Sequence, residues 1–137
     1  MATFNKFNAF VENVAEGVHN LGTGQLVVAL SNSAPIATNS VLADITQITY
    51  TNLSSRNITT STSSQTSGTY KLVLTDLVLT ASGAVGPFRY VVIYNDTPTS
   101  PADPLIGWYD YGSSISLATG ETLTIDFDAS NGLLTIA

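Results

Sequence analysis

The chain has 137 residues, the size of one domain that can bury a core without disulfides. Four Lys and Arg residues oppose ten Asp and Glu residues, and this net charge of −6 argues against nucleic acid as a partner. There is no cysteine, which excludes thiolate metal sites and thiol nucleophiles. The sequence contains no apolar run long enough to span a membrane and no signal-peptide pattern. We therefore expect no membrane partner and synthesis in a cytoplasm.

Apolar residues in the N-terminal segment recur at the spacing of a helix. Thr3 can cap the start of this helix, and Gly17 and Gly22 weaken and then end it. The sequence leaves open whether the helix packs on its own domain or forms an arm between subunits. We expect residues 1–22 to be this helix or arm and residues 23–137 to be a single β-sandwich domain. The stripe consists of Phe4, Phe7, Val11, Val14, Val18 and Leu21.

After Gly24 the apolar pattern becomes that of strands. Residues 24–32 predict a short buried strand, and residues 47–52 are a second strand candidate. Residues 38–46 fit either a helical turn or a loop. Residues 52–70 are rich in Thr and Ser, which fits either a long loop or an exposed strand with a ladder of hydroxyls.

Strands separated by turns fill the second half of the chain. Apolar runs lie on both sides of Asp76, followed by a strand that Pro87 begins and a proline-rich loop over residues 95–104. An aromatic strand and a short apolar strand come next, and residues 121–128 alternate between apolar and polar. Seven or eight short strands at this spacing predict an all-β fold, a jelly-roll-like β-sandwich with a short N-terminal α-helix.

Few residues suggest chemistry. His19 is the only histidine and has no nucleophile or carboxylate beside it in the sequence, so we interpret it as structural. Asp110 lies among three aromatic residues, as it would in a sugar-binding platform, although an aromatic strand is more often core or interface. The possible glycan contacts are Trp108, Tyr109, Asp110 and Tyr111. We expect Arg89 to pair with an aspartate of a neighbouring strand or subunit, for which Asp96, Asp110 and Asp126 are the candidates.

The C-terminal stretch IDFDASNGLLTIA, residues 125–137, resembles half of a calcium loop. Asp126 and Asp128 are weak metal candidates, because the bidentate glutamate and the leading helix of such a loop are absent. Asn131-Gly132 between two apolar runs instead favours a tight hairpin. In that hairpin, Leu123, Ile125, Phe127, Leu134 and Ile136 would face the core. We expect no cofactor, and a cation only at a subunit contact.

The segments GPFRYVVIYNDT and PLIGWYDYGSSISLATGETLTIDFDASNGLLTIA, together with FNKFNAFVENVAEGVHNLG and VALSNSAPIATNSVLADI, resemble small structural proteins of tailed bacteriophages. The resemblance covers most of the chain except residues 52–68. It rests on the residue pattern of whole segments and not on a catalytic motif. It implies a non-enzymatic virion component, most simply a capsid decoration (cement) protein. It supplies no catalytic residues.

The resemblance sets the leading functional hypothesis. A decoration protein, expected as a homotrimer, would bind the major capsid protein where capsid subunits meet and would reside in the virion after assembly in the host cytoplasm. The docking residues would be Phe4, Phe7, Val11, Val14 and Val18. The alternatives are a glycan- or receptor-binding module of a head or tail fibre, and a tail or head-completion ring protein. An enzyme ranks last, because no converging set of catalytic residue types is visible.

Overall fold

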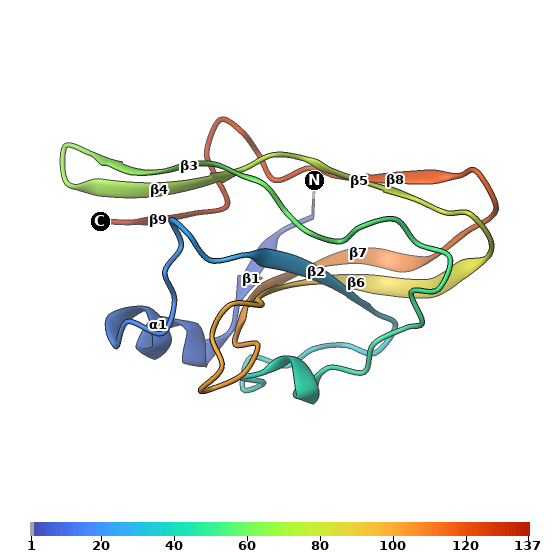
Figure 1. Ribbon diagram of the computed structural model, residues 1–137, viewed down its shortest axis with the longest axis horizontal. Helices are drawn as coiled ribbons and strands as arrows, with labels where there is room; N and C mark the ends of the chain where they lie inside the picture. The colour runs from blue at the N-terminus through green and yellow to red at the C-terminus, as the bar shows by residue number, and fades with distance from the viewer. Residues whose placement is uncertain (1) are drawn as a thin grey trace.

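The computed structural model describes residues 2–137, which form a mostly β structure with one short α-helix (Figure 1). Every strand pairing is antiparallel. In chain order, the elements are β1 (Phe4–Lys6), α1 (Asn8–Ala15), β2 (Leu26–Ser31), the 3-10 turn η1 (Leu42–Asp44), β3 (Thr60–Thr66), β4 (Thr69–Leu74), β5 (Leu77–Thr80), β6 (Val85–Asn95), β7 (Leu105–Leu117), β8 (Thr122–Ile125) and β9 (Leu134–Ile136). The all-β prediction is confirmed at this level.

The strands form two layers, which Figure 1 shows one above the other. One layer is a four-stranded sheet with the order β1-β7-β6-β2. The other contains a three-stranded sheet, β3-β4-β9, and a two-stranded sheet, β5-β8. The chain passes from β4 to β5 with a break at Thr75 and Asp76, so the two smaller sheets follow one another along the same layer (Figure 1).

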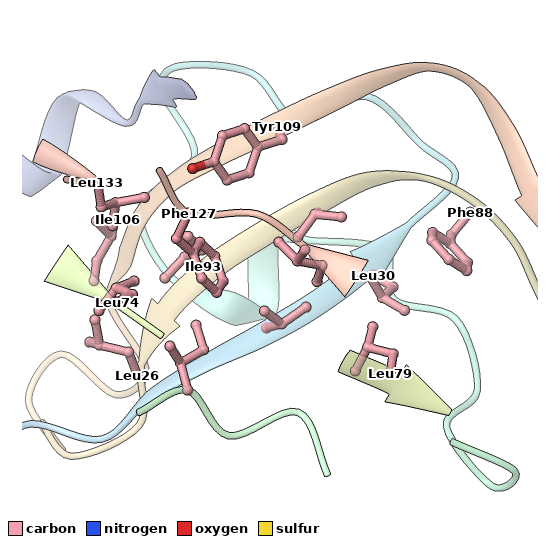
Figure 2. Close-up of a cluster of buried hydrophobic side chains, with 14 of the residues drawn as sticks. Leu26, Leu30, Leu74, Leu79, Phe88, Ile93, Ile106, Tyr109, Phe127 and Leu133 are labelled. Atoms are coloured by element: carbon pink, nitrogen blue, oxygen red, sulfur yellow. The ribbon is translucent and has the colours of Figure 1, made fainter. Parts of the chain in front are cut away.

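The main core lies between the layers (Figure 2). Leu26, Leu30 and Ile93 of the four-stranded sheet meet Leu74 and Leu79 of the opposite layer. All five are almost completely buried, at 0–1% exposure. At about 25 cal/mol per Å² of apolar surface removed from water, this shared core is the main force that holds the layers together.

The predicted strand at residues 24–32 is confirmed as β2, and all of its residues are buried. Alternate residues of β2 enter the main core, while Val27 and Ala29 face the opposite side of the sheet. There they join a second cluster with Phe7 from before α1, Ile45 from the connection after β2, and residues of β6 and β7. A strand buried on both faces reads as a continuous apolar run, and this explains the sequence LVVALS.

The residues after η1 seal the free edge of β2. Backbone N–H groups of Ile48 and Ile58 donate to the carbonyls of Leu30 and Leu26, at 3.0 and 2.9 Å. The guanidinium of Arg56 donates to the Val28 carbonyl, and the Tyr50 hydroxyl accepts from the Leu30 N–H. We call residues 48–58 along β2 the closed side. The strand expected at residues 47–52 is wrong, because this segment bonds to β2 partly through side chains and forms no regular ladder.

The N-terminal helix is shorter than the stripe of apolar residues predicts. Phe4 lies in β1 and pairs with Tyr109 of β7, and α1 begins only after Phe7, which occupies the N-cap position in place of Thr3. Phe10, which is outside the stripe, is the buried residue of α1, while Val11 is 52% exposed. The expectation of a single helix through the whole stripe is therefore wrong.

The prediction of a C-terminal hairpin is also wrong. β8 pairs with β5 and β9 pairs with β4, so the two segments around Asn131-Gly132 do not pair with each other. Asp128 and Gly132 both have positive φ, and the Gly132 N–H donates to the Asp128 carbonyl at 2.8 Å, which closes a wide turn. Phe127 is fully buried as expected, but Ile136 is 43% exposed, and Leu133 is buried instead.

The Thr-rich region contains an exposed strand, which was one of its two interpretations. β3 pairs with β4 over residues 60–74, and the turn between them has positive φ at Ser67 and Gly68. Most residues of β3 are exposed. The β3–β4 hairpin therefore extends as a hydroxyl-rich projection (Figure 1).

Candidate functional site

The side of the molecule opposite β2 has unpaired strand edges. β1 ends the four-stranded sheet and β9 ends the three-stranded sheet. Residues of both strands line one groove, so the two edges lie on the same side of the molecule. We call this the open side. An unpaired edge offers backbone donors and acceptors to another chain, and proteins usually cover or blunt such edges.

An apolar groove lies on the open side between α1 and β9. Its volume is about 710 Å³, and its walls are mostly aliphatic and aromatic, with Lys6 as the charged side chain. Val11 and Ile136, which are 52% and 43% exposed, are two of its lining residues. The full lining is Phe4, Lys6, Phe10, Val11, Val14, Ala15, Leu134, Thr135, Ile136 and Ala137.

The structure separates the five predicted docking residues. Phe4, Val11 and Val14 line the groove. Phe7 has no exposed surface and packs against Trp108, with ring centroids 4.6 Å apart, so it cannot contact a partner. Val18 lies outside the groove lining and is half-buried. Leu134 and Ile136 were not predicted as docking residues, because nothing in the local sequence places β9 beside α1.

The predicted glycan platform does not form. Tyr109 and Tyr111 belong with the main core on one face of β7, while Trp108 belongs with the second cluster on the other face. This split follows from the alternation of side chains along a strand. The four residues WYDY therefore cannot present three aromatic rings to one sugar.

Arg89 forms an ion pair with Asp110, which was one of its three candidate partners. Arg89 Nε donates to Asp110 Oδ1 at 2.7 Å and an Nη donates to Oδ2 at 3.0 Å, which is the two-pronged geometry of a strong ion pair. This hydrogen bond lowers the pKa of the Asp110 carboxyl, and the N–H of Gly112 adds to the effect. Both side chains are 38% exposed, so the pair lies at the surface, where such pairs contribute little stability.

A second hollow on the open side is acidic. It has a volume of about 600 Å³ and lies between β7 and the residues at the end of β8. Tyr109, Tyr111 and Asp126 line it together with Ala2, Asp110, Gly112 and Thr124. We call it the acidic cleft. The sequence signal that could have revealed it is the pair of tyrosines two positions apart, which places both on one face of a strand.

The two metal candidates have structural partners. Asp128 Oδ1 accepts N–H groups from Ser130 and Asn131, and Oδ2 accepts the Asn131 side-chain amide at 2.8 Å. These hydrogen bonds lower the pKa of Asp128. Asp126 Oδ1 accepts the Asp128 N–H at 2.8 Å. Within residues 2–137, no group of three or more His, Asp or Glu side chains is placed to hold a metal ion.

His19 is 7% exposed, and its Nδ1 lies 3.3 Å from the side-chain amide nitrogen of Asn95. Its ring packs against Phe10 at 5.2 Å between centroids. Burial lowers the pKa of His19 to about 4, so the imidazole is neutral at pH 7. Nε2 is buried without a partner among the described residues. His19 is therefore buried as a structural residue would be, but its Nε2 lacks the partner that a fully satisfied one would have.

No family model, curated protein or solved structure matches this chain. Among residues 2–137, no helix has both the length and the apolar character that crossing a membrane requires.

Proposed function

We propose that this protein is a virion structural protein of a tailed bacteriophage, a decoration protein that stabilises the head by binding between capsid subunits. The proposal starts from the sequence resemblance to small phage structural proteins. The observation that carries it further is the apolar groove, because large exposed aliphatic groups beside unpaired strand edges are typical of a surface that another protein covers.

The proposed occupant of the groove is an apolar segment of the major capsid protein. The lining of the groove supports this choice, because Val11, Val14, Leu134 and Ile136 can bury aliphatic side chains. Lys6 at the same site favours a segment that also carries a carboxylate. Each Å² of apolar surface covered contributes about 25 cal/mol, and the many equivalent sites on a capsid multiply the effect.

We propose a homotrimer, the symmetry expected of a protein that sits where capsid subunits meet. We also propose that the two layers are a jelly-roll-like sandwich, since the chain moves back and forth between the layers, with β2 in one, β3 to β5 in the other, β6 and β7 in the first again, and β8 and β9 in the second. Native mass spectrometry of the purified protein tests the trimer, and a hexamer or dodecamer would favour a ring protein instead.

The central experiment measures binding of the purified protein to expanded capsids that lack it. We expect binding, and we expect the bound protein to raise the temperature at which the capsids rupture. Val11→Asp and Ile136→Asp each place a charge in the groove, and each should abolish binding while leaving the folded protein intact, because both side chains are exposed.

The matched controls are Ile36→Asp and Val78→Asp, which alter residues that are 59% and 52% exposed and lie outside the groove. These variants should bind capsids as the unmodified protein does. Absence of binding by the unmodified protein would reject the capsid role. Equal loss of binding in all four variants would reject the groove as the docking surface.

A further inference from the structure

The acidic cleft has features that the proposed capsid role does not use. Its walls are β7 on one side and the end of β8 on the other, and Ala2 lies at its margin. Two tyrosines and Asp126 supply the chemistry of this cleft. A ligand of this cleft would bind whether or not the protein also binds a capsid.

Tyr109 is the first indication of a ligand. The residue is 5% exposed, and its ring packs against Phe4 and Phe127 at centroid distances of 5.4 and 6.5 Å. Figure 2 shows Tyr109 projecting from β7 into the space between the layers. Within residues 2–137 its hydroxyl forms no hydrogen bond. The one solvent-inaccessible side-chain N or O atom without a partner in that range is His19 Nε2, so the Tyr109 hydroxyl must be reached by solvent. The Tyr109 hydroxyl therefore opens onto the cleft that the residue lines.

The second indication is the charge of the cleft. Among the described residues the one ion pair joins Arg89 to Asp110, so Asp126 has no cationic partner there. Lys71 of β4 donates to the Ser130 carbonyl at 2.9 Å and forms no ion pair with Asp126. Asp126 uses Oδ1 for a backbone N–H, and Oδ2 accepts no hydrogen bond from the described residues. Among residues 2–137, Asp126 therefore lines the cleft as a hydrogen-bond acceptor without a cationic partner.

Tyr109, Tyr111 and Asp126 line the same cleft. Burial is the main cause of the raised pKa of Tyr109, and Tyr111, Asp126 and Asp128 raise it further. Burial and then Asp126 raise the pKa of Tyr111. Both hydroxyls therefore stay protonated at neutral pH, where each can still accept a hydrogen bond through its oxygen lone pairs.

The exposed atoms distinguish between classes of ligand. A sugar would need an open aromatic face on which to stack, and Tyr109 presents its hydroxyl end while its ring is buried in the core. A cationic group that donates several hydrogen bonds suits a set of carboxylate and hydroxyl acceptors. We propose that the acidic cleft binds an ammonium or guanidinium group, held by Asp126 and the hydroxyls of Tyr109 and Tyr111.

The test follows backbone amide signals of the isotope-labelled protein by NMR during titration with methylguanidinium chloride and, separately, methylammonium chloride. Methylurea is the neutral control for methylguanidinium. We expect the cations to shift the amides of Tyr111, Gly112 and Asp126 in a saturable manner and methylurea to leave them unchanged. No saturable shift with either cation, or equal shifts with methylurea, would overturn the proposal.

Variants separate specific binding from general attraction to an acidic protein. Asp126→Asn should weaken the affinity about tenfold, because it removes the charge that strengthens the hydrogen bond. Tyr109→Phe keeps the buried ring and should weaken the affinity for the cation about threefold. Glu12→Gln changes the net charge equally on the exposed face of α1 and should have no effect. If Asp126→Asn and Glu12→Gln weaken binding equally, the cleft is not the site.

A last pair of probes distinguishes a free amine from a protein side chain. Capped Gly-Arg-Gly and Gly-Lys-Gly peptides carry the same cations on a backbone. Tighter binding of the peptides than of the small cations would assign the cleft to an Arg or Lys side chain of a partner. Equal or weaker binding would assign it to a free amine or guanidine.

Discussion

The closed side and the open side are the two lateral edges of the same two-layered structure, and their unpaired strands are treated in different ways. At the closed side, residues 48–58 supply backbone and side-chain hydrogen bonds to almost every free group of β2. At the open side, β1 and β9 have no such cover within the described residues, and both hollows described above lie there. Irregular chain can therefore seal a strand edge, as it does at β2, while β1 and β9 stay uncovered within residues 2–137.

The largest expected effect is the dependence of stability on pH that His19 causes. His19 lines a hollow next to the apolar groove, and Val14 and Ile136 line both. The fold keeps the imidazole neutral, while the unfolded chain binds a proton below pH 6.5. The free energy of unfolding should therefore fall as the pH decreases from 6.5 to about 4, and His19 should cause no further loss below that. The total is about 3 kcal/mol at roughly 1.4 kcal/mol per pH unit.

Urea denaturation between pH 4 and 7 checks this prediction. His19→Phe removes the titrating group, so the stability of this variant should vary less with pH than that of the unmodified protein. The stabilisation linked to the lowered pKa values of Asp44, Asp110 and Asp128 is also lost in acid, but only below about pH 5, so the range from pH 5 to 6.5 reports chiefly on His19. A His19→Phe profile as steep as that of the unmodified protein would contradict the burial of a neutral imidazole.

Gly107→Ala should disrupt the open side. A Cβ at this position would overlap the ring of Phe4 and the carbonyl of Asn5 in β1. We expect the variant to lose about 1–3 kcal/mol of unfolding free energy, as for other overpacked sites, and to lose the NMR contacts between Phe4 and Tyr109. Gly22→Ala is the control, because its Cβ would find neighbours at ordinary contact distances of 3.4 and 3.6 Å.

Tyr50→Phe should weaken the closed side. The Tyr50 hydroxyl accepts the Leu30 N–H at 2.9 Å, and its ring lies 3.7 Å from the guanidinium carbon of Arg56. Loss of the hydroxyl leaves the Leu30 N–H without its acceptor and should cost about 1–2 kcal/mol, while the ring contact remains. Hydrogen exchange at the Leu30 amide should become faster. Unchanged exchange would mean that the strand edge does not need this seal.

Asp110→Asn should have the smallest effect on the free energy of unfolding, because the ion pair with Arg89 is at the surface. The stabilisation by this pair is present above the ordinary aspartate pKa and is lost as the pH falls through the lowered value in the fold. An NMR titration of the Asp110 carboxyl carbon in Arg89→Gln should show a higher pKa than in the unmodified protein. An unchanged pKa would show that the Gly112 N–H alone holds it down.

Much of the strand pattern could be predicted from the sequence, because it is a local property. The buried run of β2, the strand that includes Pro87 and the aromatic strand β7 all have dense apolar or aromatic residues between Gly, Pro and Asn positions. The pairing of Arg89 with Asp110 was one of three expected possibilities. It forms because β6 and β7 are neighbours with Tyr90 opposite Asp110.

The failures come from partners that are distant in the sequence. The spacing of Phe4 and Phe7 fits a helix, but Phe4 pairs with Tyr109, more than a hundred residues away. Likewise, Asn131-Gly132 is a strong local hairpin signal, but β8 and β9 bind to β5 and β4 instead. Local propensity is a weak force when a strand elsewhere in the chain offers a complete ladder and a buried face.

The candidate sites were predictable only as lists of residues. The sequence identified Val11 and Val14 as apolar and Tyr109 and Tyr111 as aromatic, and these residues do line the two hollows. The opposite walls, from Leu134 and Ile136 in one hollow and Asp126 in the other, depend on how the C-terminal segment crosses the other layer. No periodicity within β7 or α1 carries that information.

The turn of the β3–β4 hairpin has a practical consequence. Ser67 and Gly68 adopt positive φ, and a Cβ at Gly68 would meet no atom within 4 Å. The turn lies at the end of a projection whose side chains are mostly hydroxyls in contact with water. A foreign peptide inserted between these two residues would interrupt neither core, so this hairpin is a natural position from which the protein could display an epitope or an affinity tag.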